Sequence, residues 1–393
     1  MTHSQDDCQP GQVGVWLVGA RGSVATTTIV GALALRAGLT EHTGVVSALP
    51  EVAAAGLPDV ADLVFGGHDL ASTSLRKRAE ELVAGGVVPA PLLTLLQHDL
   101  AEVESRIRPG LDPERGERQA DGIARLVDDL ESFRSDAGLD RIVVVDVSST
   151  EPPVDTGDAD LADPVALGAA LERGESPLPT SSAYAFAAYQ ARCSFVSFTP
   201  SVGPRLPALE RLAEDAGVPW AGSDGKTGET LLKTVLAPMF ATRGLTVRSW
   251  ASYNMLGGGD GATLADPVAA ASKLGSKARG LESILGHEVE GPMHIDYVPD
   301  HGDWKTAMDL VSFEGFLGAR MSLQFTWTGC DSALAAPLIL DLARLVSRAH
   351  QVGRTGPQPA LGFFFKDPAG SAEHRLSAQW DALTAYCAEL GAA

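Results

Sequence analysis

The stretch VGVWLVGARGSVA, residues 13–25, decides the fold of this 393-residue chain. An apolar run over 13–18 ends at Gly19, and a stretch rich in Ala, Leu and Thr follows over 23–36. This order predicts a buried strand, a tight turn and a helix, as in a dinucleotide-binding unit. Gly19 permits the turn, and Gly22 lets a phosphate approach the backbone at the helix N-terminus. Because the spacing is G-x-x-G-x-x-A, an ordinary glycine-rich turn stays an alternative on this motif alone.

Strand and helix patterns alternate along the first part of the chain. Helical patterns cover 75–85, 91–107, 118–137 and 164–173, and apolar β-branched runs at 141–147 and 194–198 predict strands. This alternation predicts a Rossmann-like, doubly wound α/β domain over 1–224. From 225 to 336 the alternation of 245–253 and 319–327 predicts an inserted α+β domain with an antiparallel or mixed sheet. Helices and one apolar strand at 360–365 predict that 337–393 complete the first domain.

The overall composition excludes several kinds of partner. The formal net charge of −20 repels nucleic-acid phosphates and anionic membrane surfaces. No apolar run approaches ~18 residues, and the N-terminal segment lacks the pattern of a signal peptide, so we expect no membrane span. The four cysteines are far apart without metal-ligand spacing, which favours free thiols in a reducing, cytoplasmic compartment.

Lysine is rare in this chain and concentrated in its second half. Of seven lysines, six lie in that half: Lys226, Lys233, Lys273, Lys277, Lys305 and Lys366. Lys273 and Lys277 are four residues apart on one face of a predicted helix, where their repulsion favours an anion between them and a solvated basic edge stays the alternative. Unlike Arg, a buried Lys can release its proton near neutral pH. Together the lysines indicate a site for a phosphate and a developing negative charge.

Further glycine-rich and polar turns supply candidate binding residues. Residues 221–230 (AGSDGKTGET) open a helix and offer backbone N–H groups, threonine hydroxyls and Lys226 to an anion, although the full P-loop pattern is absent. Residues 252–261 (SYNMLGGGDG) form a second such turn, where Asp260 favours a ligand or cation site over a plain turn. Candidates for dinucleotide contacts at the first turn are Gly19, Arg21, Gly22, Ser23 and Val24, where Arg21 adds a positive charge. Asp69 is a further candidate, with a helix N-cap as its alternative role. Ser148 and Ser149 offer hydroxyl groups at the end of a predicted strand.

Several longer motifs occur in one order along nearly the whole chain. They are GARGSVA, VVVDVSSTEPP, SFTPSVGP, AGSDGKTGETLLKT, SYNMLGGGDG, SKLGSK, DYVPDHGDWKTAMD and FFFKDP. In this order they resemble inositol-1-phosphate synthases, especially the shorter archaeal and bacterial forms. The resemblance implies an isomerase that binds NAD tightly and cyclises glucose 6-phosphate to 1D-myo-inositol 3-phosphate. It implies oxidation at C5, enolisation, intramolecular aldol closure and re-reduction by the same NADH, in a homotetramer whose domain 225–336 serves catalysis and oligomerisation.

The resemblance also implies roles for individual residues. The essential lysines are Lys273, Lys277, Lys305 and Lys366. Lys305 polarises the carbonyl and aids aldol closure, and the other three hold phosphate or developing oxyanions. Lys273 is also a candidate for proton transfer at C5. Acids near the nicotinamide or an associated mono- or divalent cation are Asp224, Asp260 and Asp331, of which the last two are the candidate cation ligands. Residues that contact the substrate phosphate, together with Lys226, are Thr227, Gly228, Thr230 and Leu256.

Three other functions fit parts of the sequence. An NAD-dependent sugar-phosphate dehydrogenase would release NADH and need a nucleophile, for which Cys330 is the one tempting cysteine. The neighbouring Asp331 raises the expected pKa of that thiol, which favours a structural role. A non-catalytic NAD sensor would not need the convergent lysines. A diverged synthase acting on another hexose phosphate is not separated from the main prediction by the sequence.

Overall fold

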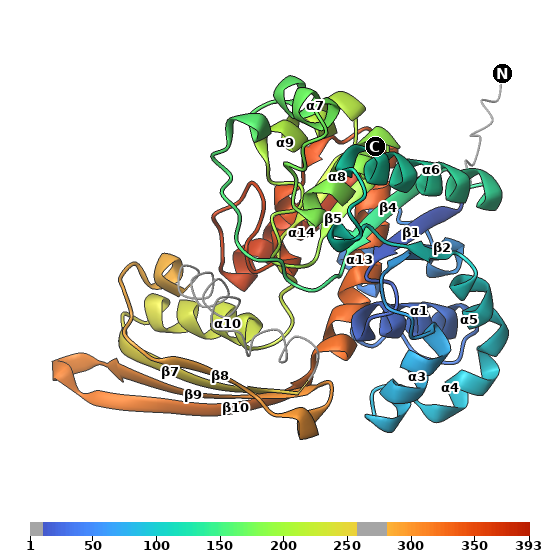
Figure 1. Cartoon of the computed structure of the whole chain (residues 1–393). Coiled ribbons are helices and arrows are strands. Elements are labelled where there is room, and N and C mark those ends of the chain that lie inside the picture. The colour runs from blue at the N-terminus through green and yellow to red at the C-terminus, as the bar shows by residue number, and fades with distance from the viewer. Residues whose placement is uncertain (1–10, 258–280) are drawn as a thin grey trace, which may run out of the picture.

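The computed structural model describes residues 11–257 and 281–393 and contains a seven-stranded parallel sheet with strand order β11-β6-β5-β4-β1-β2-β3 (Figure 1). Its strands are β1 (Val13–Val18), β2 (Leu63–Asp69), β3 (Ile107–Pro109), β4 (Arg141–Asp146), β5 (Ser194–Ser197), β6 (Pro219–Gly222) and β11 (Gly356–Pro357). The order 3-2-1-4-5-6 is that of a dinucleotide-binding sheet, so the α/β fold class is confirmed. The chain reverses its direction of winding between β1 and β4, where such sheets bind their ligands.

Helices cover both faces of this sheet. One face carries α1 (Ser23–Arg36), α3 (Leu75–Ala84), α5 (Gln97–Glu104), α13 (Asp331–Gln351) and α14 (Leu376–Ala392). The other carries α6 (Gln119–Ala137), α7 (Pro164–Glu172), α8 (Thr180–Gln190) and α9 (Pro207–Ala216). On β1, Val15 and Leu17 point into the first core and Trp16 and Val18 into the second. Burial on both faces explains why this strand is continuously apolar.

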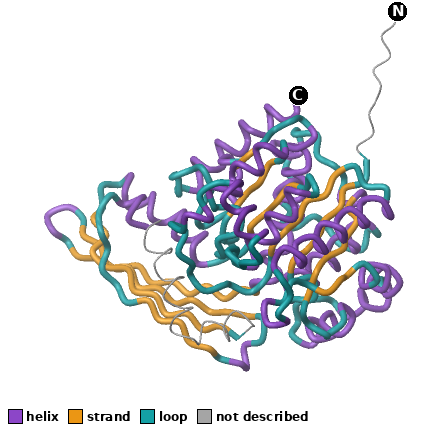
Figure 2. The backbone as a smooth tube through the Cα atoms, turned by 45° about the horizontal axis from the view of Figure 1, so that its top comes forward, coloured by secondary structure: helices purple, strands orange, loops and turns teal. Residues whose placement is uncertain are grey.

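A four-stranded sheet is inserted in the chain between β6 and β11. Its strands are β7 (Thr246–Leu256), β8 (Met293–Tyr297), β9 (Trp304–Glu314) and β10 (Arg320–Cys330), in the order β10-β9-β7-β8. Helix α10 (Glu229–Thr242) packs on one face, with Phe240, Trp250 and Val311 in a small core. Among the described residues, no helix covers the other face, which is called the bare face below (Figures 1 and 2).

The remaining elements are short. They are α2 (Pro50–Ala53), α4 (Ala90–Leu95), η1 (Val46–Ala48), η2 (Val60–Asp62), η3 (Pro113–Arg115), η4 (Ala159–Leu161), η5 (Pro299–His301), η6 (Phe316–Gly318) and η7 (Pro359–Phe364). None of the helices in the described ranges is long and apolar enough to cross a membrane.

The strand predicted at 360–365 is wrong. The structure has the 3₁₀ helix η7 there, opened by Pro359, and the strand that joins the sheet is the two-residue β11 just before it. Leu361 and Phe364 are both buried, and their spacing of three matches one turn of a 3₁₀ helix. The apolar run thus reflects packing against α14 and not a sheet position.

Candidate functional site

The turn between β1 and α1 is shaped to receive a phosphate. Gly19 has a φ of +85°, and a Cβ there would lie 3.1 Å from the Cα of Ser148. The main-chain oxygen of His68 accepts hydrogen bonds from the N–H groups of Gly19 and Ala20, which fixes the turn. Gly22 caps α1 and has no side chain that could accept from the first N–H groups of the helix. Such a terminus binds anions through its N–H groups and helix dipole.

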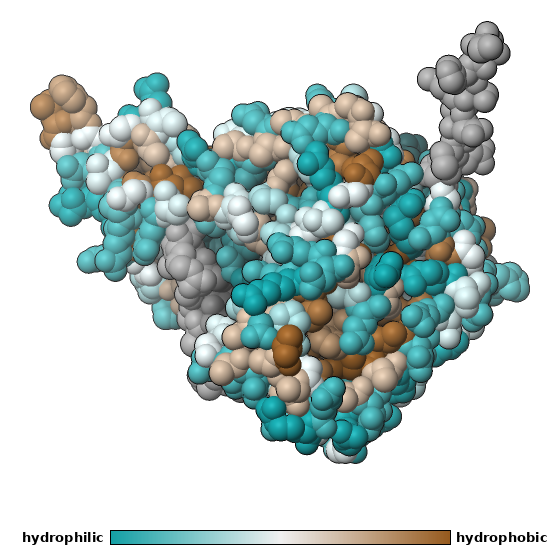
Figure 3. All heavy atoms as spheres, turned by 90° about the horizontal axis from the view of Figure 1, so that it is seen from above, coloured by the Kyte–Doolittle hydropathy of each residue, from teal (hydrophilic) through white to brown (hydrophobic). Residues whose placement is uncertain are grey.

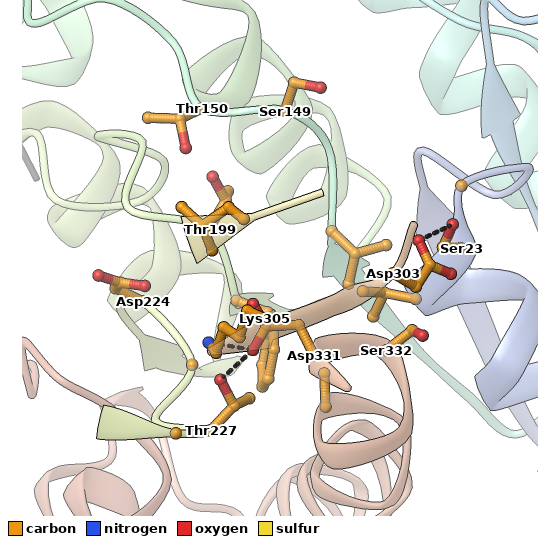
Figure 4. Close-up of a pocket in the computed structure, with 18 of the residues that line it drawn as sticks. Ser23, Ser149, Thr150, Thr199, Asp224, Thr227, Asp303, Lys305, Asp331 and Ser332 are labelled. Atoms are coloured by element: carbon orange, nitrogen blue, oxygen red, sulfur yellow. Dashed lines mark hydrogen bonds and ion pairs between the residues drawn. The ribbon is translucent and has the colours of Figure 1, made fainter. Parts of the chain in front are cut away.

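A cavity of about 600 Å³ opens beside this turn. It lies between the N-terminus of α1, the carboxyl ends of β4 and β5, and the inner faces of β7 and β9. Ser148, Ser149 and Thr150 follow β4 and contribute hydroxyl groups to its wall, as Thr199 does after β5 (Figure 4). The volume suits a small-molecule or cofactor site, and the place is the switch point of the sheet.

Two ammonium groups meet two carboxylates in this cavity. Lys366 donates to Asp224 Oδ1 at 2.7 Å, and Lys305 contacts Asp331 Oδ1, which also accepts from Thr227 Oγ1 at 3.0 Å (Figure 4). Burial alone would raise the pKa of Asp331, but the Lys305 ammonium holds it below its usual range. Asp331 is also the first residue of α13, where the helix dipole favours its charge. The cavity therefore holds fixed charges of both signs at close range.

The loop before α10 brings its backbone against Lys305. A Cβ on Gly228 would lie 3.0 Å from Lys305 Cε and 3.2 Å from its Nζ. Gly228 caps α10 with φ −130° and ψ −110° and has no side chain that could accept from the first N–H groups of this helix. The arrangement can hold a phosphate on backbone N–H groups while a lysine stays within reach of the rest of the substrate.

Most of the predicted site residues within the described ranges line this one cavity. They are Gly22, Ser23, Val24, Ser148, Ser149, Asp224, Thr227, Gly228, Thr230, Leu256, Lys305, Asp331 and Lys366. The predictions for Asp260, Lys273 and Lys277 lie outside the described residues. The roles assigned to these residues from the sequence stay predictions.

Three predicted residues support the site without lining the cavity. The Arg21 guanidinium bonds to Glu104 at 2.7 Å and to the oxygen of Ala71 at 2.9 Å. The Asp69 carboxylate accepts from the N–H groups of Arg21 and Ala71, which orders the end of β2 in place of the helix N-cap considered above. Lys226 is buried against Gln379 of α14, and its ammonium lies 5.9 Å from the centroid of the Phe363 ring. Burial lowers the pKa of Lys226 to about 7.

Three charged residues of the cavity were not predicted from the sequence: Arg78, Glu229 and Asp303. Asp303 accepts from Ser23 Oγ at 3.2 Å and so joins the inserted sheet to the start of α1. Burial raises the pKa of Asp303, which lies close to Asp331. Arg78 of α3 also lines the cavity and donates to the main-chain oxygen of Arg21 at 3.1 Å. The position of Asp303, two residues before Lys305 in GDWK, was the available signal.

Cys330, the candidate nucleophile of the alternative dehydrogenase, is not exposed in the cavity. It is 5% exposed, and its sulfur lies 3.3 Å from Ser332 Oγ. A thiol enclosed in this way does not meet the access that a catalytic nucleophile needs.

Sequence comparisons place this architecture among known proteins. A family model described as myo-inositol-1-phosphate synthase, of an NAD-binding class, matches residues 13–387. The inositol-3-phosphate synthase 1 of Bacteroides thetaiotaomicron is 31% identical over 404 residues, covering 94% of this chain and 93% of that protein. The human inositol-3-phosphate synthase 1 is 32% identical over 349 residues, covering 79% of this chain but only 61% of the human protein.

Solved structures share the fold. Inositol-3-phosphate synthase from Caenorhabditis elegans matches with a TM-score of 0.84 at 22% identity, over 97% of this chain and 86% of that one. A myo-inositol-1-phosphate synthase-related protein from Thermotoga maritima matches with a TM-score of 0.77 at 22% identity, over 96% and 98% of the two chains. With the family match along nearly its whole length, this chain belongs to the myo-inositol-1-phosphate synthase family.

Proposed function

We propose that this enzyme uses NAD to convert glucose 6-phosphate to 1D-myo-inositol 3-phosphate. The observation that carries the proposal is the meeting of Lys305 and Lys366 with two carboxylates beside the uncapped start of α1. Redox chemistry needs the dinucleotide turn, and ring closure needs cations at a developing oxyanion. One cavity supplies both, as expected when oxidation, cyclisation and reduction occur on one bound substrate.

The residues of the first sheet fit NAD. Gly22 leaves room at the α1 terminus, and Ser148, Ser149 and Thr150 offer hydroxyls to ribose or phosphate oxygens. When bound, NAD would accept a hydride from C5 of the sugar and return it after ring closure. The chain's contribution is to hold the dinucleotide against the substrate and to keep water from the reactive ketone.

The loop before α10 would hold the substrate phosphate. Thr227, Gly228 and Thr230 line the cavity with hydroxyl groups and backbone N–H groups at the start of that helix. From there the Lys305 ammonium, 16% exposed, would polarise a carbonyl oxygen and stabilise the charge that develops during aldol closure. Lys366 would stabilise a second oxyanion or transfer a proton, with Asp224 holding its ammonium in place.

A cation would also fit in the cavity, coordinated by carboxylate and hydroxyl oxygens. Asp303, Asp331, Ser23 and Ser332 all line the cavity near the start of α1. Two carboxylates close to a bound pyrophosphate would repel it unless a mono- or divalent cation lay between them. Over residues 11–257 and 281–393, no group of three or more His, Cys, Asp or Glu side chains is arranged to hold a metal without such help. Substrate phosphate or NAD oxygens would complete the coordination.

The bare face of the four-stranded sheet supports a homo-oligomer, which we propose to be a tetramer. Large apolar side chains between 40% and 46% exposed lie on this face of its strands: Tyr253, Trp304, Met308 and Leu310. At the far end of the β9–β10 hairpin, where Figure 3 shows a brown tip, Phe316 and Leu317 are almost fully exposed. Patches of this kind mark protein interfaces. Light scattering of a Leu310→Asp variant should give a smaller assembly than the wild type, and an unchanged mass would contradict this interface.

We also propose a cytoplasmic location. Cys193, Cys330 and Cys387 are buried free thiols, which suit a reducing compartment.

The decisive experiment for the reaction is product identification. Purified protein is incubated with glucose 6-phosphate and catalytic NAD, and the products are separated against inositol phosphate standards. Inositol phosphate without net NADH supports the proposal. Stoichiometric NADH with an oxidised sugar phosphate supports the simple dehydrogenase instead, and turnover of another hexose phosphate alone supports a diverged synthase.

A further inference from the structure

Lys233 lies behind the cavity wall, on the side of α10 that faces the four-stranded sheet. It is 5% exposed and does not line the cavity. Its Nζ is 2.5 Å from Oε1 of Glu229, one turn earlier on the helix, and donates to Ser252 Oγ on β7 at 3.3 Å. The ammonium also lies 5.6 Å from the Trp250 ring centroid. A cation this deeply buried is retained at a high desolvation cost, so its partners explain its presence.

A second carboxylate is linked to this ammonium through the Ser252 hydroxyl. Asp309 of β9 is 4% exposed, and its Oδ1 accepts from Ser252 Oγ at 2.5 Å and from Trp250 Nε1 at 2.8 Å. Burial raises the pKa of Asp309, and the charge of Glu229 adds to this effect, while the hydrogen bonds from Ser252 and Trp250 and the charge of Lys233 oppose it. Lys233 thus contacts the Glu229 carboxylate directly and is connected to the Asp309 carboxylate through Ser252.

This network begins at the loop proposed to hold the substrate phosphate. Glu229 is the first residue of α10 and lines the cavity next to Gly228 and Thr230. At the other end, Asp309 is on β9 four residues after Lys305, and alternation places both side chains on the inner face of the sheet. The contacts from Glu229 through Lys233 and Ser252 to Asp309 therefore connect the phosphate loop to the strand that carries Lys305.

We propose that Lys233 is a positioning residue, which holds the start of α10 against β7 and β9 and screens Glu229 and Asp309 from the substrate phosphate. This inference rests on the proposed function. Without Lys233, two buried carboxylates would face a phosphate across the cavity wall, and like charges repel strongly where water is excluded. The phosphate would then bind more weakly, while the dinucleotide turn on the other sheet would be unaffected.

The test compares Lys233→Met with the double variant Glu229→Gln/Lys233→Met. Lys77→Met is the matched control, because Lys77 is exposed on α3 and pairs with Glu80 at 3.6 Å on the surface. We expect K233M to raise the KM for glucose 6-phosphate roughly tenfold or more, which is about 1.4 kcal/mol, with the Kd for NAD unchanged. K77M should match the wild type in both constants.

The double variant separates screening from packing. If charge matters, removing the Glu229 carboxylate as well lowers the KM below that of K233M, although one more native side chain is lost. Equal or higher KM in the double variant would overturn the inference, as would a KM for K233M that matches K77M. If circular dichroism shows that K233M does not fold, the double variant Glu229→Gln/Lys233→Met is compared with the single variant Glu229→Gln. There the added K233M change should raise the KM, and equal values overturn the inference.

A binding measurement keeps this inference separate from the proposed reaction. Calorimetric titration with inorganic phosphate should show weaker binding to K233M than to K77M, whether or not the wild type turns over glucose 6-phosphate. Absence of wild-type turnover with this difference intact would refute the proposed function alone. Equal phosphate affinity of the two variants would refute the role of Lys233.

Discussion

Replacing Lys305 by Met should abolish most of the activity while leaving the fold intact. The change removes the ammonium that contacts Asp331 and lies under the Gly228 backbone. Loss of one preorganised group at a developing oxyanion typically lowers kcat about 10²- to 10³-fold, or roughly 3–4 kcal/mol. The side chains of Lys305 and Asp331 are 16% and 32% exposed, so the fold should lose only about 1–2 kcal/mol.

The stability loss stays small because Asp331 keeps other partners. Its carboxylate still accepts from Thr227 at 3.0 Å and lies in the first turn of α13. The K305M variant should therefore bind NAD with the wild-type Kd. Since the assigned role of Lys305 is in ring closure, oxidation of the substrate should persist, and NADH absorbance should accumulate on the enzyme in a single turnover.

The assay follows inositol phosphate formation and NADH absorbance together. Lys305→Arg is the matched control, which keeps the charge and should recover part of the activity, although its planar group cannot occupy the space of an ammonium. A kcat of K305M within threefold of the wild type would refute the assigned role. Loss of NAD binding together with activity would show that Lys305 acts through the fold.

Three further predictions concern the turns and the buried lysine. Gly19→Ala should raise the Kd for NAD roughly tenfold. A φ of +85° costs a residue with a Cβ about 1–2 kcal/mol, and the new methyl group would lie against Ser148. An unchanged Kd in a fluorescence titration would contradict this prediction. Gly228→Ala should displace the Lys305 side chain and lower kcat/KM roughly 10- to 100-fold, with NAD binding unchanged. Wild-type kinetics would contradict the close packing of Lys305 against Gly228. Because burial lowers the pKa of Lys226 from 10.5 to about 7, the unfolded chain binds one more proton between these pH values. The difference in the free energy of unfolding between the wild type and Lys226→Met should therefore rise with pH across this window, by up to about 1.4 kcal/mol per pH unit. Urea titrations measure this difference. A difference that stays constant or falls with pH would refute a buried neutral amine at Lys226.

The first strand, turn and helix could be predicted to the residue. The expected ranges 13–18 and 23–36 are those of β1 and α1, because an apolar run, two glycines and a helix-forming stretch each act locally. The error at 360–365 arose where local pattern was ambiguous. A short apolar run fits a strand or a tight helix, and packing of Leu361 and Phe364 decided between them.

The direction of individual side chains was less predictable than the motifs. The residue types of the phosphate loop suggested that Lys226 faces an anion, but its ammonium instead meets Gln379, 153 positions later in the chain. Arg21 likewise turns to Glu104, 83 positions away. Such partners come together only in the folded chain. Composition and spacing therefore identified the site, whereas tertiary contacts determine which lysine and arginine side chains line it.

The origin of the final hydride tests the account most directly. Glucose 6-phosphate carrying deuterium at C5 is converted in the presence of excess unlabelled NAD and NADH, and the inositol phosphate is analysed by mass spectrometry. A single cavity that retains the cofactor through oxidation, closure and reduction predicts that the deuterium returns to the ring. Deuterium in the free NADH pool, with an unlabelled or acyclic product, would contradict the proposed reaction.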